Sequence, residues 1–208
     1  MPTEFGDSII VSGDVTYSGE LQPGLARAQI VQDNLANYAI PFTEMRVHDA
    51  PQTLLPGTAA ADDLAIVGTA YGTDTLAIQT SDSKAASVTQ YALFTWPLPV
   101  EFTAAQSVRV KVKAGMVTTV SDGTAVVDVE AYLSNDEGAV SGSDLVSSAA
   151  ASVNSLTAAE NSFVLDGSGL VPGSVLNIRV RASVVDSATA TAVILRVGRV
   201  TCQADVKG

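Results

Sequence analysis

The chain has 208 residues, of which 22 are acidic and 11 are basic, so its formal net charge is -11. A nucleic-acid-binding face needs clustered Lys and Arg, and the densest basic pattern is Lys111 and Lys113 in alternation, so no nucleic acid is expected as a partner. No window approaches the roughly 20 apolar residues that span a bilayer, and residues 1–10 lack the basic start of a signal peptide. We therefore expect neither a membrane anchor nor export.

The first 60 residues differ in pattern from the rest. A segment near residues 24–36 has helical spacing, and Pro41 prevents the helix from continuing. Residues 38–57 are apolar yet contain three prolines, which a regular strand ladder does not tolerate. Such a segment must bury its side chains on its own domain or on another subunit. The pattern predicts an extended N-terminal arm over residues 1–60, with one short helix near 24–36.

Residues 61–208 predict a β-sandwich domain. Hydrophobic residues make up 47% of the chain but aromatic residues only 5%, which favours thin sheets packed with small side chains. Val108, Val110 and Val112 alternate with Arg109 and Lys111, as in a strand with one buried face. The fold class is therefore predicted as all-β, a jelly-roll-like antiparallel β-sandwich. The predicted strands cover residues 64–71, 75–80, 88–96, 107–119, 125–133, 162–165, 175–185 and 192–204.

A Cys–His catalytic pair would have to combine Cys202, the only cysteine, with His48, the only histidine. Cys202 shares a strand face with Val200 and Ala204, so a buried, inert thiol is the better interpretation. His48 lies in the Pro-rich segment and is interpreted as a packing or interface residue. One histidine also rules out a His-rich metal site.

Acidic residues at turns are candidate oxygen ligands for calcium. None has the spacing of a calcium loop, so solvated turn carboxylates are the favoured interpretation. Asp128 and Glu130 share a strand face, as a glycosidase pair would, but such enzymes usually bind sugars on aromatic platforms, and this chain has only one Trp. The chain is therefore predicted to be no enzyme and to need no cofactor or metal. The turn carboxylates considered are Asp62, Asp63, Asp122, Asp136 and Glu137.

Several segments of the chain resemble a family of tailed-phage virion proteins, similar in kind to capsid decoration or cement proteins. The resemblance implies a jelly-roll-like body on the outside of a capsid, the major capsid protein as partner, and a homotrimer. It also implies a chain made in the host cytoplasm and located on the virion surface. The segments that carry the resemblance are residues 13–19 (GDVTYSG), 38–41 (YAIP), 46–50 (RVHDA), 55–58 (LPGT), 114–116 (AGM) and 202–208 (CQADVKG).

If the resemblance holds, the N-terminal arm is the natural clamp on the capsid, because its apolar side chains bury area on a partner. An arm that covers its own sheet edge stays open as an alternative. So do a tail or head-fibre protein that binds a host receptor or glycan, and an enzyme or carbohydrate-binding module. The predicted partner-interface residues are Leu25, Ile30, Leu35, Ile40, Phe42, Met45 and His48.

Overall fold

The structure, a computed structural model, describes residues 34–120, 123–186 and 192–206. Its regular elements are almost all strands, and every strand pair is antiparallel. A single turn of 3₁₀ helix spans Phe42–Glu44. No helix in these ranges is long and apolar enough to cross a bilayer.

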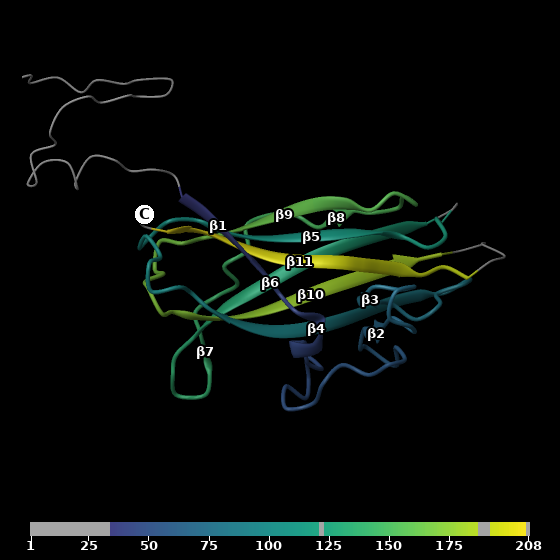
Figure 1. Ribbon diagram of the computed structural model, residues 1–208, viewed down its shortest axis with the longest axis horizontal. Helices are drawn as coiled ribbons and strands as arrows, with labels where there is room; N and C mark the ends of the chain where they lie inside the picture. Colours follow the sequence, from purple (N-terminus) through teal and green to yellow (C-terminus); the bar gives the residue numbers. More distant parts are fainter. Residues whose placement is uncertain (1–33, 121–122, 187–191, 207–208) are drawn as a thin grey trace, which may run out of the picture. The chain divides into compact units, whose positions relative to one another are not determined.

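The strands form two sheets (Figure 1). The first, here the β11 sheet, has the order β2-β3-β11-β5-β9, with β1 also pairing with β11; the second, the β10 sheet, has the order β4-β10-β6-β7, with β8 also pairing with β6. This confirms the predicted all-β antiparallel sandwich. The strands of the β11 sheet are β1 (Asn34–Ala39), β2 (Ala65–Val67), β3 (Ala77–Gln79), β5 (Val108–Met116), β9 (Ala159–Leu165) and β11 (Leu195–Val206). Those of the β10 sheet are β4 (Ser87–Pro97), β6 (Thr124–Ser134), β7 (Val140–Ser141), β8 (Ala151–Ser152) and β10 (Val175–Val185).

The core is built by strict alternation along the long strands. Every second residue of β10 from Leu176 to Val184 is buried, and the residues between them are partly exposed. Strand β5 shows the same alternation, with Val108, Val110 and Val112 inside. Because successive side chains of a strand point to opposite faces, each sheet has one apolar face and one polar face. The two apolar faces form one core cluster.

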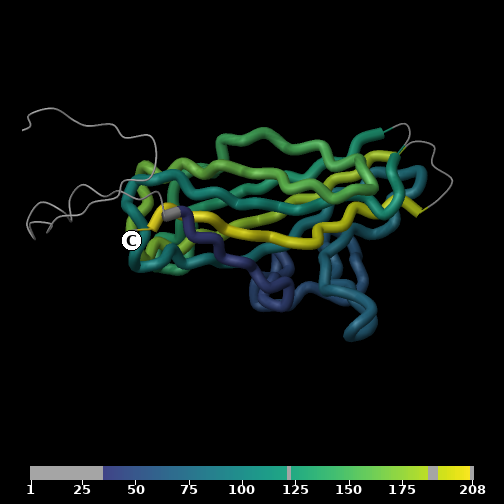
Figure 2. The backbone as a smooth tube through the Cα atoms, turned by 45° about the horizontal axis from the view of Figure 1, so that its top comes forward, coloured from purple at the N-terminus to yellow at the C-terminus, as the bar shows by residue number. Residues whose placement is uncertain are grey.

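The structure groups part of the predicted N-terminal arm with the sandwich. The chain divides at residue 33, so residues 34–60 belong to the sandwich unit. Residues 34–36, predicted as the end of a helix, are part of strand β1, which pairs along its whole length with β11 (Figure 2). Backbone pairing with β11 outweighs the weak helical spacing there, because each added pair satisfies backbone groups of both strands. The rest of the predicted helix lies outside the described residues.

Candidate functional site

The predicted interface residues do not form one surface. Phe42 and Met45 are buried in the core, at 8% and 0% exposure, so the surface of the described structure does not present them. Leu35 is half-exposed on β1, Ile40 is partly buried against the core, and the His48 side chain is mostly buried. The remaining two, Leu25 and Ile30, lie outside the described residues.

The outer face of the β11 sheet gathers basic side chains from two neighbouring strands. Arg109, Lys111 and Lys113 all point outward from β5, since the residues between them are buried. On β11, Arg199 lies opposite Lys113, and Arg196 is exposed on the same side. These five residues, here the basic face, are 5 of the 11 basic residues in a chain of net charge -11.

A β-bulge at Gly198 places Arg199 on this face. The pairing of β11 with β5 shifts register between Val197 and Arg199, so two consecutive residues face outward. Val197 and Val200 are both buried as a result. Without the extra residue, strict alternation would turn Arg199 into the core, because one residue of slip moves a side chain to the other face.

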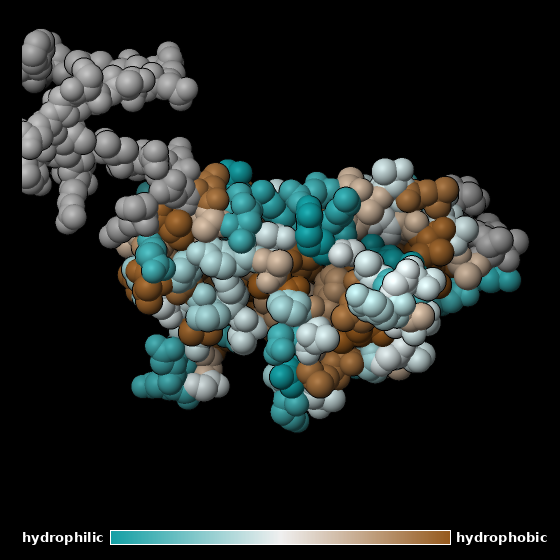
Figure 3. All heavy atoms as spheres, in the orientation of Figure 1, coloured by the Kyte–Doolittle hydropathy of each residue, from teal (hydrophilic) through white to brown (hydrophobic). Residues whose placement is uncertain are grey.

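Two carboxylates balance the basic face only in part. Glu160 of β9 pairs with Arg199 at 2.7 Å and with Lys111 at 3.9 Å, and Asp205 lies further along β11. Among the described residues, Arg109 and Lys113 form no ion pair. Figure 3 shows hydrophilic side chains gathered over β5 and β9. The face is therefore locally positive on an acidic protein.

Strand β1 lies at the edge of this face. Within the part of the chain that the structure describes, β1 pairs only with β11, which leaves its other backbone edge open. Two hollows of about 240 and 290 Å³ run between β1 and the basic side chains. They are lined by Leu35, Gln106, Ser107, Arg109, Gln203 and Asp205, and by Asn37, Ala39, Lys111, Glu160, Arg199 and Thr201.

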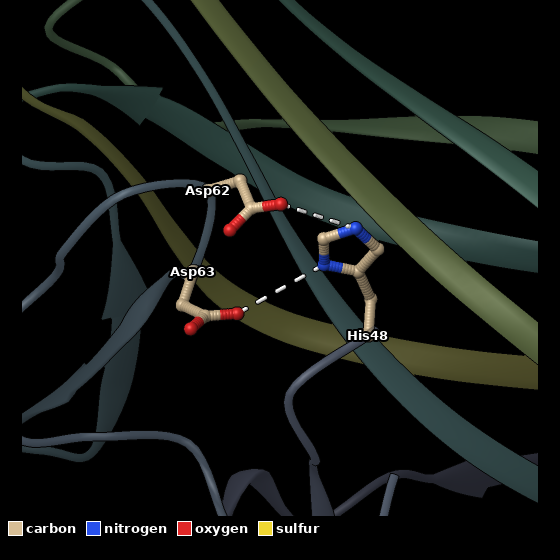
Figure 4. A group of neighbouring side chains, drawn as sticks. All are labelled: His48, Asp62 and Asp63. Atoms are coloured by element: carbon tan, nitrogen blue, oxygen red, sulfur yellow. Dashed lines mark ion pairs between the residues drawn. The ribbon is translucent and has the colours of Figure 1, made fainter. Parts of the chain in front are cut away.

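A second cluster lies beside the β10 sheet and consists of His48, Asp62 and Asp63 (Figure 4). His48 Nε2 lies 3.4 Å from Asp62 Oδ2, and His48 Nδ1 lies 3.9 Å from Asp63 Oδ1. The two carboxylates thus face different nitrogens of one imidazole. One donor atom from each residue can be chosen so that all three atoms lie within 4.8 Å of one another.

Strand β4 holds this cluster in place from two sides. Arg46 pairs with Leu93 of β4, its amide donating at 2.7 Å, which holds His48, two residues further along, beside β4. On the other side the amide of Tyr91 donates to the Asp62 carbonyl at 2.7 Å. The His48 ring also packs on the Tyr91 ring, with centroids 4.5 Å apart. Sequence reasoning weighed His48 and the two aspartates separately, since only this pairing brings them together.

Negative charge outweighs positive charge around Asp63. Burial raises the pKa of Asp63 above its ordinary value, the carboxylates of Asp62 and Asp49 raise that pKa further, and His48 opposes them. Asp63 Oδ1 and His48 Nδ1 are both fully buried, and neither has a hydrogen-bond partner. Buried polar atoms without partners are uncommon and costly in folded proteins.

The surroundings of Cys202, Asp128 and Glu130, the candidate catalytic residues, do not favour catalysis. Cys202 is buried, and burial raises the pKa of its thiol far above the usual range. The Asp128 and Glu130 carboxylates each accept from an arginine of β10, Asp128 from Arg181 at 2.6 Å and Glu130 from Arg179. Both carboxylates are therefore tied to a fixed cation. Asp122, also considered above, lies outside the described residues.

Comparison with known proteins found no matching family model and no matching curated protein. Among solved structures, the chain is similar to the CBM22-2 xylan-binding domain of Paenibacillus barcinonensis Xyn10C, with 12% identity, a TM-score of 0.44, and 81% of this chain and 98% of that chain covered. The xylan-binding module CBM15 gives 13% identity and a TM-score of 0.42 over 83% and 99% of the two chains.

A chain from the structure of infectious bursal disease virus, Gt strain, gives 16% identity and a TM-score of 0.33, covering 100% of this chain and 40% of that chain. Similarity at these levels assigns no function. The function is argued from the chain's own residues.

Proposed function

We propose that this chain is a non-enzymatic structural protein of a phage virion that binds the outside of the capsid as a decoration, or cement, protein. One observation carries the choice of surface: the basic face holds 5 of the 11 basic residues of a chain whose net charge is -11. The sequence resemblance to tailed-phage virion proteins supplies the class of partner, the major capsid protein.

The charge distribution supports a fixed orientation on an acidic partner. Complementary charge steers association and penalises wrong orientations more than it adds raw affinity. Free copies repel one another through their acidic remainder, whereas a lattice with acidic patches attracts the basic face. Many identical weak contacts on a shell then add through multivalency.

The open edge of β1 supports a contact of a second kind. An exposed strand edge presents unpaired N–H and C=O groups that pair readily with another chain. Leu35 adds apolar area at the same place, being 51% exposed. We propose that this edge contributes either to the capsid contact or to a homotrimer, and light scattering of the purified protein distinguishes a trimer from a monomer.

Charge reversal on the basic face tests the proposal. Arg109→Glu and Lys113→Glu change side chains without an ion pair in the described part of the chain, so the sandwich should stay folded. Co-sedimentation with capsids assembled without this protein should show binding about tenfold weaker or worse for the double variant. Binding of the unmodified protein should fall as ionic strength rises.

Lys84→Glu is the matched control, since Lys84 is exposed on a turn outside the basic face. Equal binding by the double variant and the control would reject the basic face as the contact. Failure of the unmodified protein to bind capsids at any ionic strength would reject the decoration function itself.

A hollow beside β4 favours a second candidate, a tail or head-fibre protein that binds a host receptor or glycan. The hollow measures about 580 Å³, within the usual range of ligand sites, and combines polar with apolar side chains. Glycan-array binding that is lost in Asn177→Ala would support this candidate over capsid decoration. Its lining residues are Ile40, Pro41, Glu44, Arg46, Pro51, Gln52, Leu93, Phe94, Thr95 and Asn177.

A further inference from the structure

We propose that His48, Asp62 and Asp63 bind one divalent transition-metal cation, with Zn²⁺ as the probe. The site is separate from the basic face, since its residues lie beside β4 of the other sheet. The proposal therefore stands whether or not the chain binds a capsid.

Two buried atoms of the cluster have a spacing that one bridging cation fits. His48 Nδ1 and Asp63 Oδ1 are 3.9 Å apart, too far for a direct hydrogen bond. Zinc bonds of about 2.0–2.1 Å to nitrogen and about 2.0–2.2 Å to oxygen allow one cation to bridge the two atoms. Both atoms are buried and lack any other partner, so a bridging cation would satisfy both at once.

Asp62 is the third ligand, and it lies on the solvent-exposed side of the cluster. Asp62 Oδ2 faces the other imidazole nitrogen, 3.4 Å from Nε2, so the Asp62 side chain has to turn to reach a cation bound at Nδ1. It has room to turn, because it is 46% exposed, against 14% for His48 and 20% for Asp63. Two donors are thus fixed inside, and one reaches solvent. Three protein ligands leave a fourth position for water or for a group from a partner, as in open zinc sites.

The charge and the ligand types of the cluster also favour a transition-metal cation. Asp62 and Asp63 both face the His48 imidazole, and Asp49 follows His48 in the chain. Arg179 lies 4.5 Å from the centroid of the Tyr91 ring and is already paired with Glu130. A nitrogen ligand favours zinc and its neighbours over calcium and magnesium, which prefer oxygen alone.

The backbone that carries the two aspartates is held in place before any cation binds. The fully buried Gln90 donates to the Ala61 carbonyl at 3.1 Å and accepts from the Ser81 amide at 2.7 Å. This anchors the turn that carries both aspartates. Ala61 has a positive φ of 47°, which reverses the chain just before Asp62. Sites on fixed backbone bind metals with less ordering cost.

The test is zinc binding to tag-free protein that has been treated with a chelator. Calorimetry should show one Zn²⁺ per chain, and the thermal midpoint should rise with Zn²⁺, because a cation that binds only the folded state stabilises it. His48→Ala and Asp63→Asn should each weaken binding about tenfold or more. Asp136→Asn, an exposed turn carboxylate elsewhere in the chain, is the matched control and should bind as the unmodified protein does.

His48 is the only histidine, so its imidazole resonances report the site directly. Zn²⁺ should shift them in a manner that assigns Nδ1 as the ligand, and this readout needs no variant to fold. Unshifted imidazole resonances at saturating Zn²⁺, or zinc affinity unchanged in His48→Ala, would overturn the proposal. Coordination through Nε2 would overturn the bridging geometry.

Discussion

Met45 and Leu35 are large apolar side chains of one segment with opposite surroundings. Met45 is 0% exposed and packs in the core cluster, whereas Leu35 is 51% exposed on the edge strand β1. Removing buried atoms forfeits transfer free energy and leaves a cavity, while removing exposed atoms does neither. We therefore expect Met45 to contribute more than Leu35 to the free energy of unfolding.

Met45→Ala should lower the free energy of unfolding by about 2–5 kcal/mol. Leu35→Ala, the matched control, should change it by no more than about 0.5 kcal/mol. Urea denaturation of the purified protein measures both. A small effect of Met45→Ala would mean that Met45 is not part of the core.

At this scale the sequence allowed only part of the candidate sites to be predicted. The alternation of Arg109, Lys111 and Lys113 identifies one polar strand face without help. Arg199 could not be added to it, because counting by twos along β11 fails at Gly198. His48 and Asp63 meet only because both segments pair with β4, and that pairing is not local.

Gly167 and Gly169 lie in one loop after β9 but differ in their surroundings. A Cβ added at Gly167 would lie 1.7 Å from the backbone oxygen of Gln106, whereas nothing lies within 4 Å of a Cβ at Gly169. Neither residue is among the glycines of positive φ, so the backbone itself accepts alanine at both. The difference is purely one of close approach between two loops at one end of the sandwich.

Gly167→Ala should destabilise the fold by about 1–3 kcal/mol, the usual cost of forced overpacking. Gly169→Ala should be neutral within about 0.5 kcal/mol. Thermal unfolding of the two variants side by side checks this. Equal midpoints would show that the loops separate without cost.

The long strands were predicted from the sequence, whereas strand β1 was not. The long strands followed from alternation, because burial of one face imposes a period of two on the sequence. Residues 34–36 of β1 were predicted as the end of a helix, since Leu35 also fits a helical stripe and pairing with a distant strand leaves no local signal. Phe42 and Met45 were predicted as partner-interface residues because an apolar, Pro-rich segment does not show by itself which surface it covers.

On the scale of the whole molecule, the boundary at residue 33 decides which part of the chain is needed for folding. The sandwich unit begins there. Removing residues 1–57 would delete β1 and four core side chains with it, namely Phe42, Met45, Val47 and Leu55. The arm predicted from prolines and apolar residues is thus partly core.

A chain lacking residues 1–32 should keep its β-type circular dichroism and a cooperative thermal transition. A chain lacking residues 1–57 should lose both, because several buried side chains would be missing at once. Circular dichroism with a thermal scan distinguishes the two. Cooperative folding of the shorter chain would contradict the placement of residues 34–57 in the core.

The pairing of β1 with β11 also sets how the sandwich responds to force. Asn34 lies opposite Val206, so the two ends of this unit are neighbours on one ladder. A pull between them loads the Asn34–Val206 pair first and then each following pair in turn, which opens β1 like a zipper at low force. A load applied along β5 or β10 instead has to break many pairs together, so the sandwich is mechanically weak at the Asn34–Val206 end of β1 and strong across its middle.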